Sequence, residues 1–180
     1  ALGQQLDGTL KKIKDSNTFT LGYLTSAPPF SFPGPDKRPV GYSIDLCTQI
    51  ASKIQDQLGT TLKLNWVPVT TENRLDMVAS GKVDIECGTT TASLSRQERV
   101  DFSLMTFVDG GGLLTKKDFT LRAVGDLADK RVAIIPGTTT ETAFNKFLKE
   151  EFVTVKLVPV KNHLEGLMAL QNGSAEAFAS

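Results

Sequence analysis

Hydrophobic and polar positions follow two kinds of period along the chain, and the order of these periods occurs twice. Apolar residues that alternate with polar ones predict strands, whereas apolar residues that recur every three or four positions predict helices. After a short helix at 6–14, the first half is predicted to alternate strands and helices, at 18–24, 43–58, 62–66, 71–80 and 83–87. The second half repeats this order, at 131–135, 140–150, 153–158, 163–171 and 175–180.

This alternation predicts an α/β fold in which parallel sheets are flanked by helices. Residues 100–130 separate the two copies and contain Gly110, Gly111 and Gly112. We therefore predict two lobes, residues 1–108 and 109–180, with a hinge near 106–115. A plain surface loop is the other interpretation of the three glycines, and the pattern does not decide between them.

Both ends of the long helix at 43–58 carry sequence signals. Ser43 is expected to cap the N-terminus, with Asp45 in the first turn, where a negative charge is favourable. Gly59 is expected to end the helix, because glycine adopts the left-handed conformation without strain. Before this helix, the many prolines at 26–39 predict a loop.

Composition argues against several classes of function. The chain has 20 Lys and Arg against 20 Asp and Glu, so nothing favours nucleic acid or an anionic membrane as a partner. No apolar run approaches the ~20 residues that span a bilayer, so direct membrane insertion is not expected. A single His and two separated Cys do not make a metal site, and we expect no metal and no cofactor.

Cys47 and Cys87 leave two interpretations open. Two buried free thiols are the favoured one. A disulfide that ties a helix to a neighbouring strand is the alternative, and it would require an oxidising compartment.

The same tetrapeptide, Gly-Thr-Thr-Thr, follows a predicted strand in each half, at 88–91 and at 137–140. In open α/β sheets, ligands bind beyond the carboxyl ends of the strands, near helix N-termini. Glycine lets a ligand approach the backbone, amides at a helix start donate to an anion, and threonine hydroxyls both donate and accept. Thr-rich turns are also common helix caps, but the duplication at corresponding places favours a carboxylate-binding site.

Basic residues lie at the same edges. Arg96 follows the first tetrapeptide, and its planar guanidinium suits a carboxylate, whereas Arg99 is expected to be an ordinary surface arginine. Arg74 lies one turn inside the helix that Thr71 opens, and His163 opens a helix in the second half. The chain has no dinucleotide or phosphate-binding glycine motif and no Gly-x-Ser-x-Gly elbow, so catalysis has no support.

Short motifs stand in a specific order along the chain, at 27–32, 41–46, 73–75, 80–84, 86–103, 126–132 and 137–139. This ordered set resembles the polar amino acid-binding proteins of ABC transporters, solute-binding protein family 3, over essentially the whole chain. Within that family it resembles the glutamate/aspartate-binding branch. The resemblance implies a two-lobe, periplasmic-binding-protein-like (type II) fold and a protein that binds an L-amino acid without changing it.

The resemblance implies roles in binding the main-chain groups of the ligand. Arg96 matches the arginine that holds the α-carboxylate. Thr89 and Thr91 match contacts to the α-amino and carboxylate groups, and Thr139, with Thr138, matches a contact from the second lobe. Closure of the two lobes on one zwitterion is the implied mechanism.

Arg74, Thr71 and His163 match groups that hold a side-chain carboxylate, which implies glutamate or aspartate as the ligand. A protonated His163 would favour such a ligand, so binding would weaken above the pKa of histidine, nominally ~6.5. That branch has a further arginine where this chain has Leu24. With one cation fewer, glutamine, asparagine or another neutral polar amino acid is the alternative ligand.

The resemblance also implies a location and partners. We expect a monomeric periplasmic protein, or a lipid-anchored extracellular one, that delivers its ligand to the permease subunits of an ABC transporter. Family members continue past residue 180, so the first lobe is expected to lack its C-terminal return segment. Two rivals share the fold: an enzyme similar to cyclohexadienyl dehydratase, with Glu141 or His163 as general acid, and a sensory ligand-binding domain.

Overall fold

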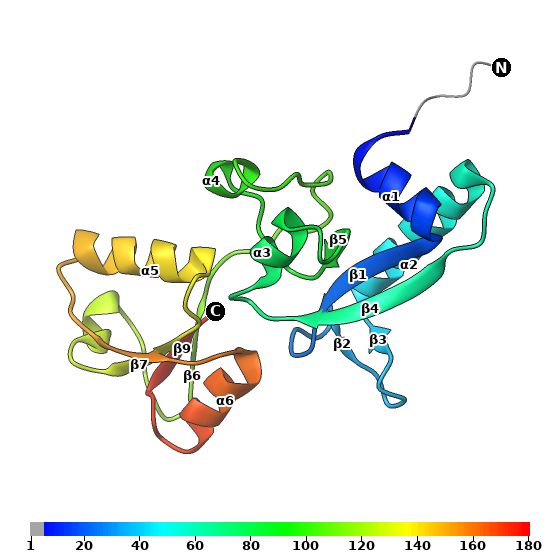
Figure 1. Ribbon diagram of the computed structural model, residues 1–180. Helices are drawn as coiled ribbons and strands as arrows, with labels where there is room; N and C mark the ends of the chain where they lie inside the picture. Colours follow the sequence, from blue (N-terminus) through cyan, green and yellow to red (C-terminus); the bar gives the residue numbers. More distant parts are fainter. Residues whose placement is uncertain (1–5) are drawn as a thin grey trace. The chain divides into compact units, whose positions relative to one another are not determined.

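The computed structural model describes residues 6–180 and shows an α/β protein that divides into two compact units, Ala1–Phe102 and Ser103–Ser180 (Figure 1). The predicted α/β class with parallel sheets is confirmed. The predicted lobe boundary at 108 and the hinge near 106–115 stay predictions. No helix among residues 6–180 is both long and apolar enough to cross a membrane.

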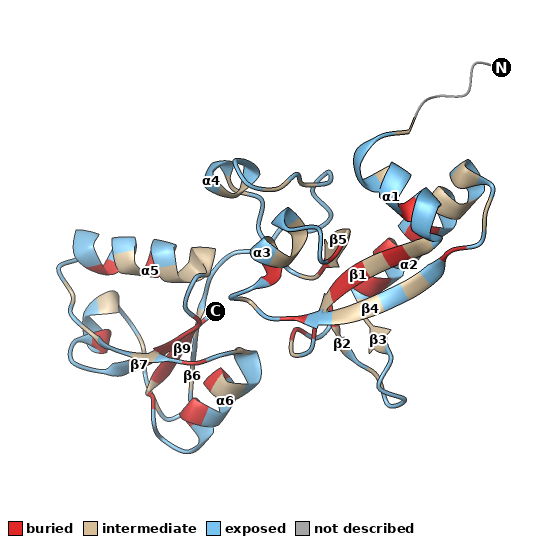
Figure 2. Cartoon of the chain, viewed as in Figure 1, coloured by how far each residue is buried: buried red, intermediate tan, exposed pale blue. Residues whose placement is uncertain are grey.

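The first unit is built on a three-stranded parallel sheet of order β4-β1-β5. Its strands are β1 (Thr18–Leu24), β4 (Lys63–Val69) and β5 (Ile85–Cys87), and β2 (Phe32–Pro33) and β3 (Pro39–Val40) form a small antiparallel pair. The helices are α1 (Gly8–Ser16), α2 (Tyr42–Leu58), α3 (Arg74–Ala79) and α4 (Leu94–Gln97). β1 lies between its two partners, so its apolar side chains fill the core, and Figure 2 shows it largely buried.

The second unit has a four-stranded sheet of order β6-β9-β7-β8, in which only β6 runs antiparallel to its neighbour. The strands are β6 (Leu113–Thr115), β7 (Arg131–Ile134), β8 (Lys156–Pro159) and β9 (Ala177–Ala179), with helices α5 (Thr139–Glu150), α6 (His163–Gln171) and the short 3₁₀ helix η1 (Val124–Leu127). The inner strands are largely buried, and separate apolar clusters form on the two sides of the sheet.

The predicted strands and helices of both halves are present, with ends that move by a few residues. The sequence did not predict β2, β3, β6 or α4, which are too short to show a period. Ser43 as the cap of α2 is wrong: the helix begins at Tyr42, and Gly41 occupies the cap position with φ 124°. A side chain at Gly41 would meet the Phe30 carbonyl oxygen at 2.4 Å, so this position requires glycine, and Ser43 lies inside the first turn.

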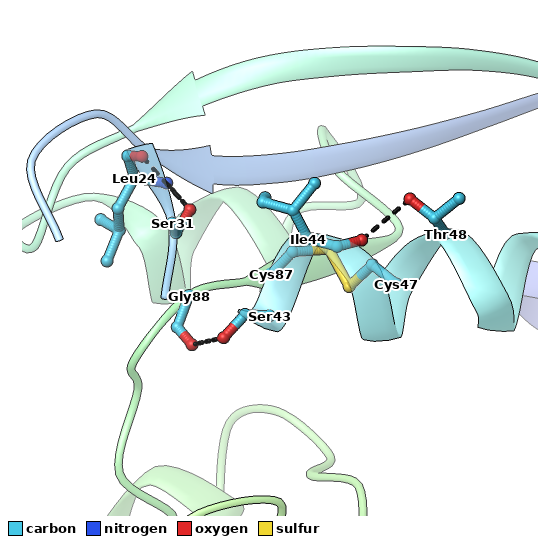
Figure 3. The surroundings of a disulfide bond; sticks show 8 residues. All are labelled: Leu24, Ser31, Ser43, Ile44, Cys47, Thr48, Cys87 and Gly88. Atoms are coloured by element: carbon cyan, nitrogen blue, oxygen red, sulfur yellow. Dashed lines mark hydrogen bonds between the residues drawn. A yellow bond between two sulfur atoms is a disulfide. The ribbon is translucent and has the colours of Figure 1, made fainter. Parts of the chain in front are cut away.

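The favoured interpretation of the cysteines as free thiols is also wrong. Cys47 and Cys87 form a disulfide that joins α2 to the end of β5 (Figure 3). Both residues are buried in the main apolar cluster of the first unit. Packing of α2 against the sheet brings their Cα atoms to 6.2 Å, within the range that a disulfide spans, although 40 positions separate them in the sequence.

Candidate functional site

The first tetrapeptide, residues 88–91, leaves the carboxyl end of β5 directly after the disulfide. The Ser43 hydroxyl donates to the Gly88 carbonyl oxygen at 2.8 Å, so the start of α2 fixes the start of this loop (Figure 3). The loop then enters α4, where the Ser93 side chain accepts a hydrogen bond from the Arg96 amide at 3.4 Å. These anchors hold both ends of the tetrapeptide.

Three charged side chains from different elements interact electrostatically beside this loop: Arg74 of α3, Glu86 of β5 and Arg96 of α4. Arg74 is only 5 % exposed, and an arginine is rarely so deeply buried. Arg96 is half-buried, and its Nη1 donates to the Thr91 carbonyl oxygen at 2.9 Å. The guanidinium of Arg96 therefore turns towards the tetrapeptide.

A tight turn places Arg74. The Thr70 amide donates to the side-chain oxygen of Asn73 at 2.9 Å, and the Asn73 amide donates back to the Thr70 hydroxyl at 3.2 Å. The Arg74 amide then donates to the Thr70 carbonyl oxygen, which starts α3. Thr71, expected as a site residue, lies half-buried within this turn.

Burial dominates the electrostatics of the three charged groups. It lowers the pKa of Arg74 and of Arg96, and the negative charge of Glu86 partly offsets this shift in each arginine. Burial raises the pKa of Glu86, and attraction to Arg74 opposes the shift most strongly. The Thr90 hydroxyl also opposes it, because it lies close enough to the Glu86 carboxylate to stabilise its charge, although the two do not form a hydrogen bond of good geometry. Each ion loses hydration, so all three are sensitive to any further charge placed beside them.

Three polar atoms here are buried without a partner in hydrogen-bonding geometry among residues 6–180: Arg74 Nε, Glu86 Oε1 and Thr90 Oγ1. A buried polar atom without a partner costs about 1–3 kcal/mol, and folded proteins contain few of them. Their concentration at one strand end indicates a place where a polar ligand could supply the missing bonds. No group of three or more potential metal ligands exists in the described part of the chain.

Gly88 and Leu24 pack closely beside the Glu86 carboxylate. A Cβ at Gly88 would lie 2.0 Å from Glu86 Oε1 and 2.9 Å from Leu24 Cδ1, so both side chains occupy the space that glycine leaves. The Ser31 hydroxyl holds the backbone of Leu24, accepting from its amide at 2.9 Å and donating to its carbonyl at 3.2 Å (Figure 3). Leu24 thus presents an apolar wall beside the Glu86 carboxylate.

The second tetrapeptide, residues 137–140, forms hydrogen bonds with the start of its own helix. The Thr138 hydroxyl caps α5, accepting from the Glu141 amide at 3.1 Å and donating to the Ile135 carbonyl at 2.8 Å. The Glu141 carboxylate accepts from the Gly137 amide at 2.8 Å. A carboxylate of the chain itself therefore already lies at this helix start. Thr139 follows Thr138 as the first residue of α5 and is half-buried.

His163 is the first residue of α6, and its exposed ring lies edge-on to Phe178 with centroids 6.2 Å apart. Asn162 is the cap of this helix, and its side chain accepts from the Glu165 amide at 3.0 Å. Thr89 and Thr91 of the first unit are exposed. The structure thus brings Arg74 and Arg96 together with the first tetrapeptide, whereas Thr138, Thr139 and His163 belong to the second unit.

Sequence reasoning missed Glu86 and Thr90. One signal could have found Glu86, because it is a charged residue in a short strand whose neighbours Val83 and Cys87 are fully buried. A charged side chain in such a buried strand requires a partner, either from the fold itself or from a bound ligand. For Thr90 the sequence holds no signal that distinguishes it from Thr89 and Thr91.

Comparison with known proteins agrees with these observations. The chain matches the family of bacterial extracellular solute-binding proteins, family 3, over residues 19–165. It is 37 % identical over 179 residues to the L-glutamate/L-aspartate-binding protein of Pseudomonas aeruginosa, covering 98 % of this chain and 59 % of that one. It is 34 % identical over 171 residues to the glutamate/aspartate import solute-binding protein of Escherichia coli, covering 94 % and 57 %.

Among solved structures, the chain is similar to an ancestral amino acid-binding protein described as a precursor of cyclohexadienyl dehydratase. The TM-score is 0.84 at 29 % identity, over 96 % of this chain and 74 % of the other. The chain spans less than two thirds of the length of the two relatives named above. The resemblance found in the ordered motifs is confirmed, and the chain belongs to family 3 of the bacterial extracellular solute-binding proteins.

Proposed function

We propose that this chain binds a polar L-amino acid, with an acidic one favoured, for uptake through the permease subunits of an ABC transporter. One observation carries the proposal. The buried Arg74 and the half-buried Arg96 lie within electrostatic reach of each other beside a glycine-threonine loop, and buried polar atoms without hydrogen-bond partners lie in the same region. Two cations and unsatisfied donors and acceptors at a strand end are what a zwitterion requires. The relatives that bind glutamate and aspartate support the same ligand class.

Arg96 holds the α-carboxylate of the ligand in this proposal. Its hydrogen bond to the Thr91 carbonyl orients the guanidinium towards the loop, where Thr89 and Thr91 contact the α-carboxylate and α-ammonium groups. Thr138 and Thr139 add contacts from the second unit.

The ligand side chain interacts with Arg74, Thr71 and His163. Burial strengthens the interaction of Arg74 with any carboxylate that reaches it, because a buried ion has little water to compete for it.

Binding takes place outside the cytoplasm, in a monomeric protein. The Cys47–Cys87 disulfide supports this location, since disulfides form and persist in oxidising compartments. The ligand leaves chemically unchanged. In support, the Glu141 carboxylate, which with His163 is one of the two candidate acids of the rival enzyme, accepts a hydrogen bond from the Gly137 amide.

A neutral polar amino acid such as glutamine is the second candidate ligand. Leu24 and Glu86 support it, because an apolar wall and a carboxylate beside the arginines reduce the positive charge available to a second carboxylate.

A thermal-shift screen of the complete protein against the twenty amino acids tests the proposal. A ligand at 100 times its Kd stabilises the folded state by roughly 2.7 kcal/mol, which is readily detected. We expect stabilisation by glutamate and aspartate, or by glutamine and asparagine if the neutral candidate holds. Absence of a shift with every amino acid would contradict the proposal.

A further inference from the structure

Two side chains of α2 hold consecutive residues at the start of the first tetrapeptide. The Ser43 hydroxyl donates to the Gly88 carbonyl oxygen at 2.8 Å, and Cys47 forms the disulfide with Cys87 (Figure 3). Ser43 and Cys47 are four positions apart, so they lie on the same face of the helix. One hydrogen bond and one covalent bond therefore connect a single helix face to the point where β5 ends and the tetrapeptide begins.

The start of α2 is itself held in place by the chain before it. The Tyr42 amide donates to the Pro29 carbonyl oxygen at 3.0 Å. The Ser43 amide donates to the Phe30 carbonyl oxygen, also at 3.0 Å. These bonds use backbone donors of the first turn, which have no partners within the helix. The Ser43 side chain is consequently not needed as a cap, and its hydroxyl, on a residue that is only 9 % exposed, binds the tetrapeptide instead.

Gly88 is the residue of the tetrapeptide that most needs this restraint. Glycine has the widest choice of backbone conformations, so a loop that begins with glycine changes direction easily unless other groups hold it. The peptide group is planar, and its carbonyl and amide point in opposite directions. The bond from Ser43 to the Gly88 carbonyl therefore also sets the direction of the Thr89 amide, at one of the residues expected to contact the ligand.

We propose that Ser43 and the Cys47–Cys87 disulfide are positioning residues, which hold the first tetrapeptide in its ligand-binding conformation before the ligand arrives. This inference rests on the proposed function, because it concerns the same site. When the binding-competent conformation is only partly populated, the apparent affinity falls by that fraction. Loss of the Ser43 hydrogen bond should lower ligand affinity roughly two- to tenfold, in line with the net contribution of one hydrogen bond.

Hydrogen exchange of the ligand-free complete protein tests the positioning directly, in Ser43→Ala and in the matched control Thr48→Val. The Thr48 hydroxyl also donates to a backbone carbonyl, that of Ile44 at 2.9 Å, but this bond stays within α2 (Figure 3). We expect residues 88–93 to exchange faster in Ser43→Ala than in the control. The amides of β1 report global opening of the unit, so a loss of protection in β1 as large as that in residues 88–93 would show general destabilisation and overturn the inference.

Titration calorimetry with L-glutamate and L-glutamine measures the consequence for binding, at a temperature where each variant is folded. Ser43→Ala should weaken the ligand that the wild type binds roughly two- to tenfold, and Thr48→Val should leave its affinity unchanged. Replacement of both Cys47 and Cys87 by Ala should weaken binding at least as much. Ser43→Ala decides the question if the variant without the disulfide does not fold.

Binding kinetics separate positioning from direct contact. Loss of a preformed loop slows association and leaves dissociation unchanged, whereas loss of a ligand contact speeds dissociation. Stopped-flow measurements on Ser43→Ala should therefore show the slower association, and faster dissociation alone would contradict a positioning role. If the wild type binds no amino acid, the proposed function fails, and hydrogen exchange still reports on the loop. If Ser43→Ala exchanges faster but binds as well as the wild type, only the positioning role fails.

Discussion

The tetrapeptide Gly-Thr-Thr-Thr follows a parallel strand in each unit, yet its two copies have different partners. In the second unit, Thr138 caps α5 and Glu141, three residues later, accepts from the Gly137 amide, so the chain satisfies its own helix start. In the first unit no acidic residue stands at that spacing, and the Thr90 hydroxyl is buried without a hydrogen-bonding partner among residues 6–180. Identical tetrapeptides therefore form different hydrogen bonds, depending on the residues that follow them along the chain.

The disulfide gives the largest expected difference between the units, because it lies next to the first tetrapeptide only. A loop closed by residues 40 positions apart stabilises the folded state by roughly 4 kcal/mol in the chain-entropy model. Replacing both Cys47 and Cys87 by Ala should therefore destabilise the first unit by about this amount and leave the second unchanged. Urea unfolding followed by fluorescence of Trp66, the single tryptophan of the chain, reports on the first unit.

Hydrogen exchange of the α5 and α6 amides is the matching readout for the second unit. Equal loss of protection in these helices and of stability around Trp66 would show that the two units unfold together and would contradict an effect confined to the first unit.

Alanine substitutions at Gly88 and Gly137, the first residues of the two tetrapeptides, should have different effects. At Gly88, the new Cβ would displace the Glu86 carboxylate and the Leu24 methyl group, which costs roughly 1–3 kcal/mol and should also lower ligand affinity at least tenfold. At Gly137, the space is open and only the positive φ of 74° is unfavourable, so about 1–2 kcal/mol of strain is expected with little loss of affinity. Chemical denaturation and calorimetry measure both; equal losses of affinity would contradict the distinction.

Removal of single threonine hydroxyls from the two tetrapeptides should give the smallest difference in stability. Thr138→Ala removes the cap of α5 and should cost about 1 kcal/mol of stability. Thr90→Ala removes a hydroxyl without a hydrogen-bonding partner in the described chain and should change the stability of the first unit by less than ~0.5 kcal/mol. Urea denaturation of the two variants checks this, and a Thr90→Ala loss as large as that of Thr138→Ala would show that the hydroxyl has a structural partner after all.

The repeated α/β pattern could be predicted because amphipathic elements carry a clear period: β1 matches its predicted limits, and α5 differs from its predicted limits by one residue. The start of α2 could not, since the tight approach of Gly41 to Phe30 is a tertiary contact that overrides the local preference for Ser43. The disulfide was missed for the same reason, because spacing in the sequence does not reveal how α2 packs on β5.

Of the candidate site, Arg74 and Arg96 could be placed at one edge because both follow strands whose carboxyl ends meet there. Glu86 could not be recognised as their companion, since a strand residue reveals its partners only when the neighbouring elements are placed. The Thr138-x-x-Glu141 spacing, by contrast, is a capping signal that the sequence did contain.

Titration calorimetry of the favoured amino acid with Arg96→Ala and Arg99→Ala tests the central claim most directly. Arg96 is half-buried beside Glu86 and the first tetrapeptide, whereas Arg99 is exposed and pairs with the exposed Asp76, a contact worth little. Removing one partner of a buried ionic contact costs roughly 3–5 kcal/mol, or about two to four decades of affinity. We predict that loss for Arg96→Ala and nearly unchanged binding for Arg99→Ala; equal losses in the two variants would contradict the account.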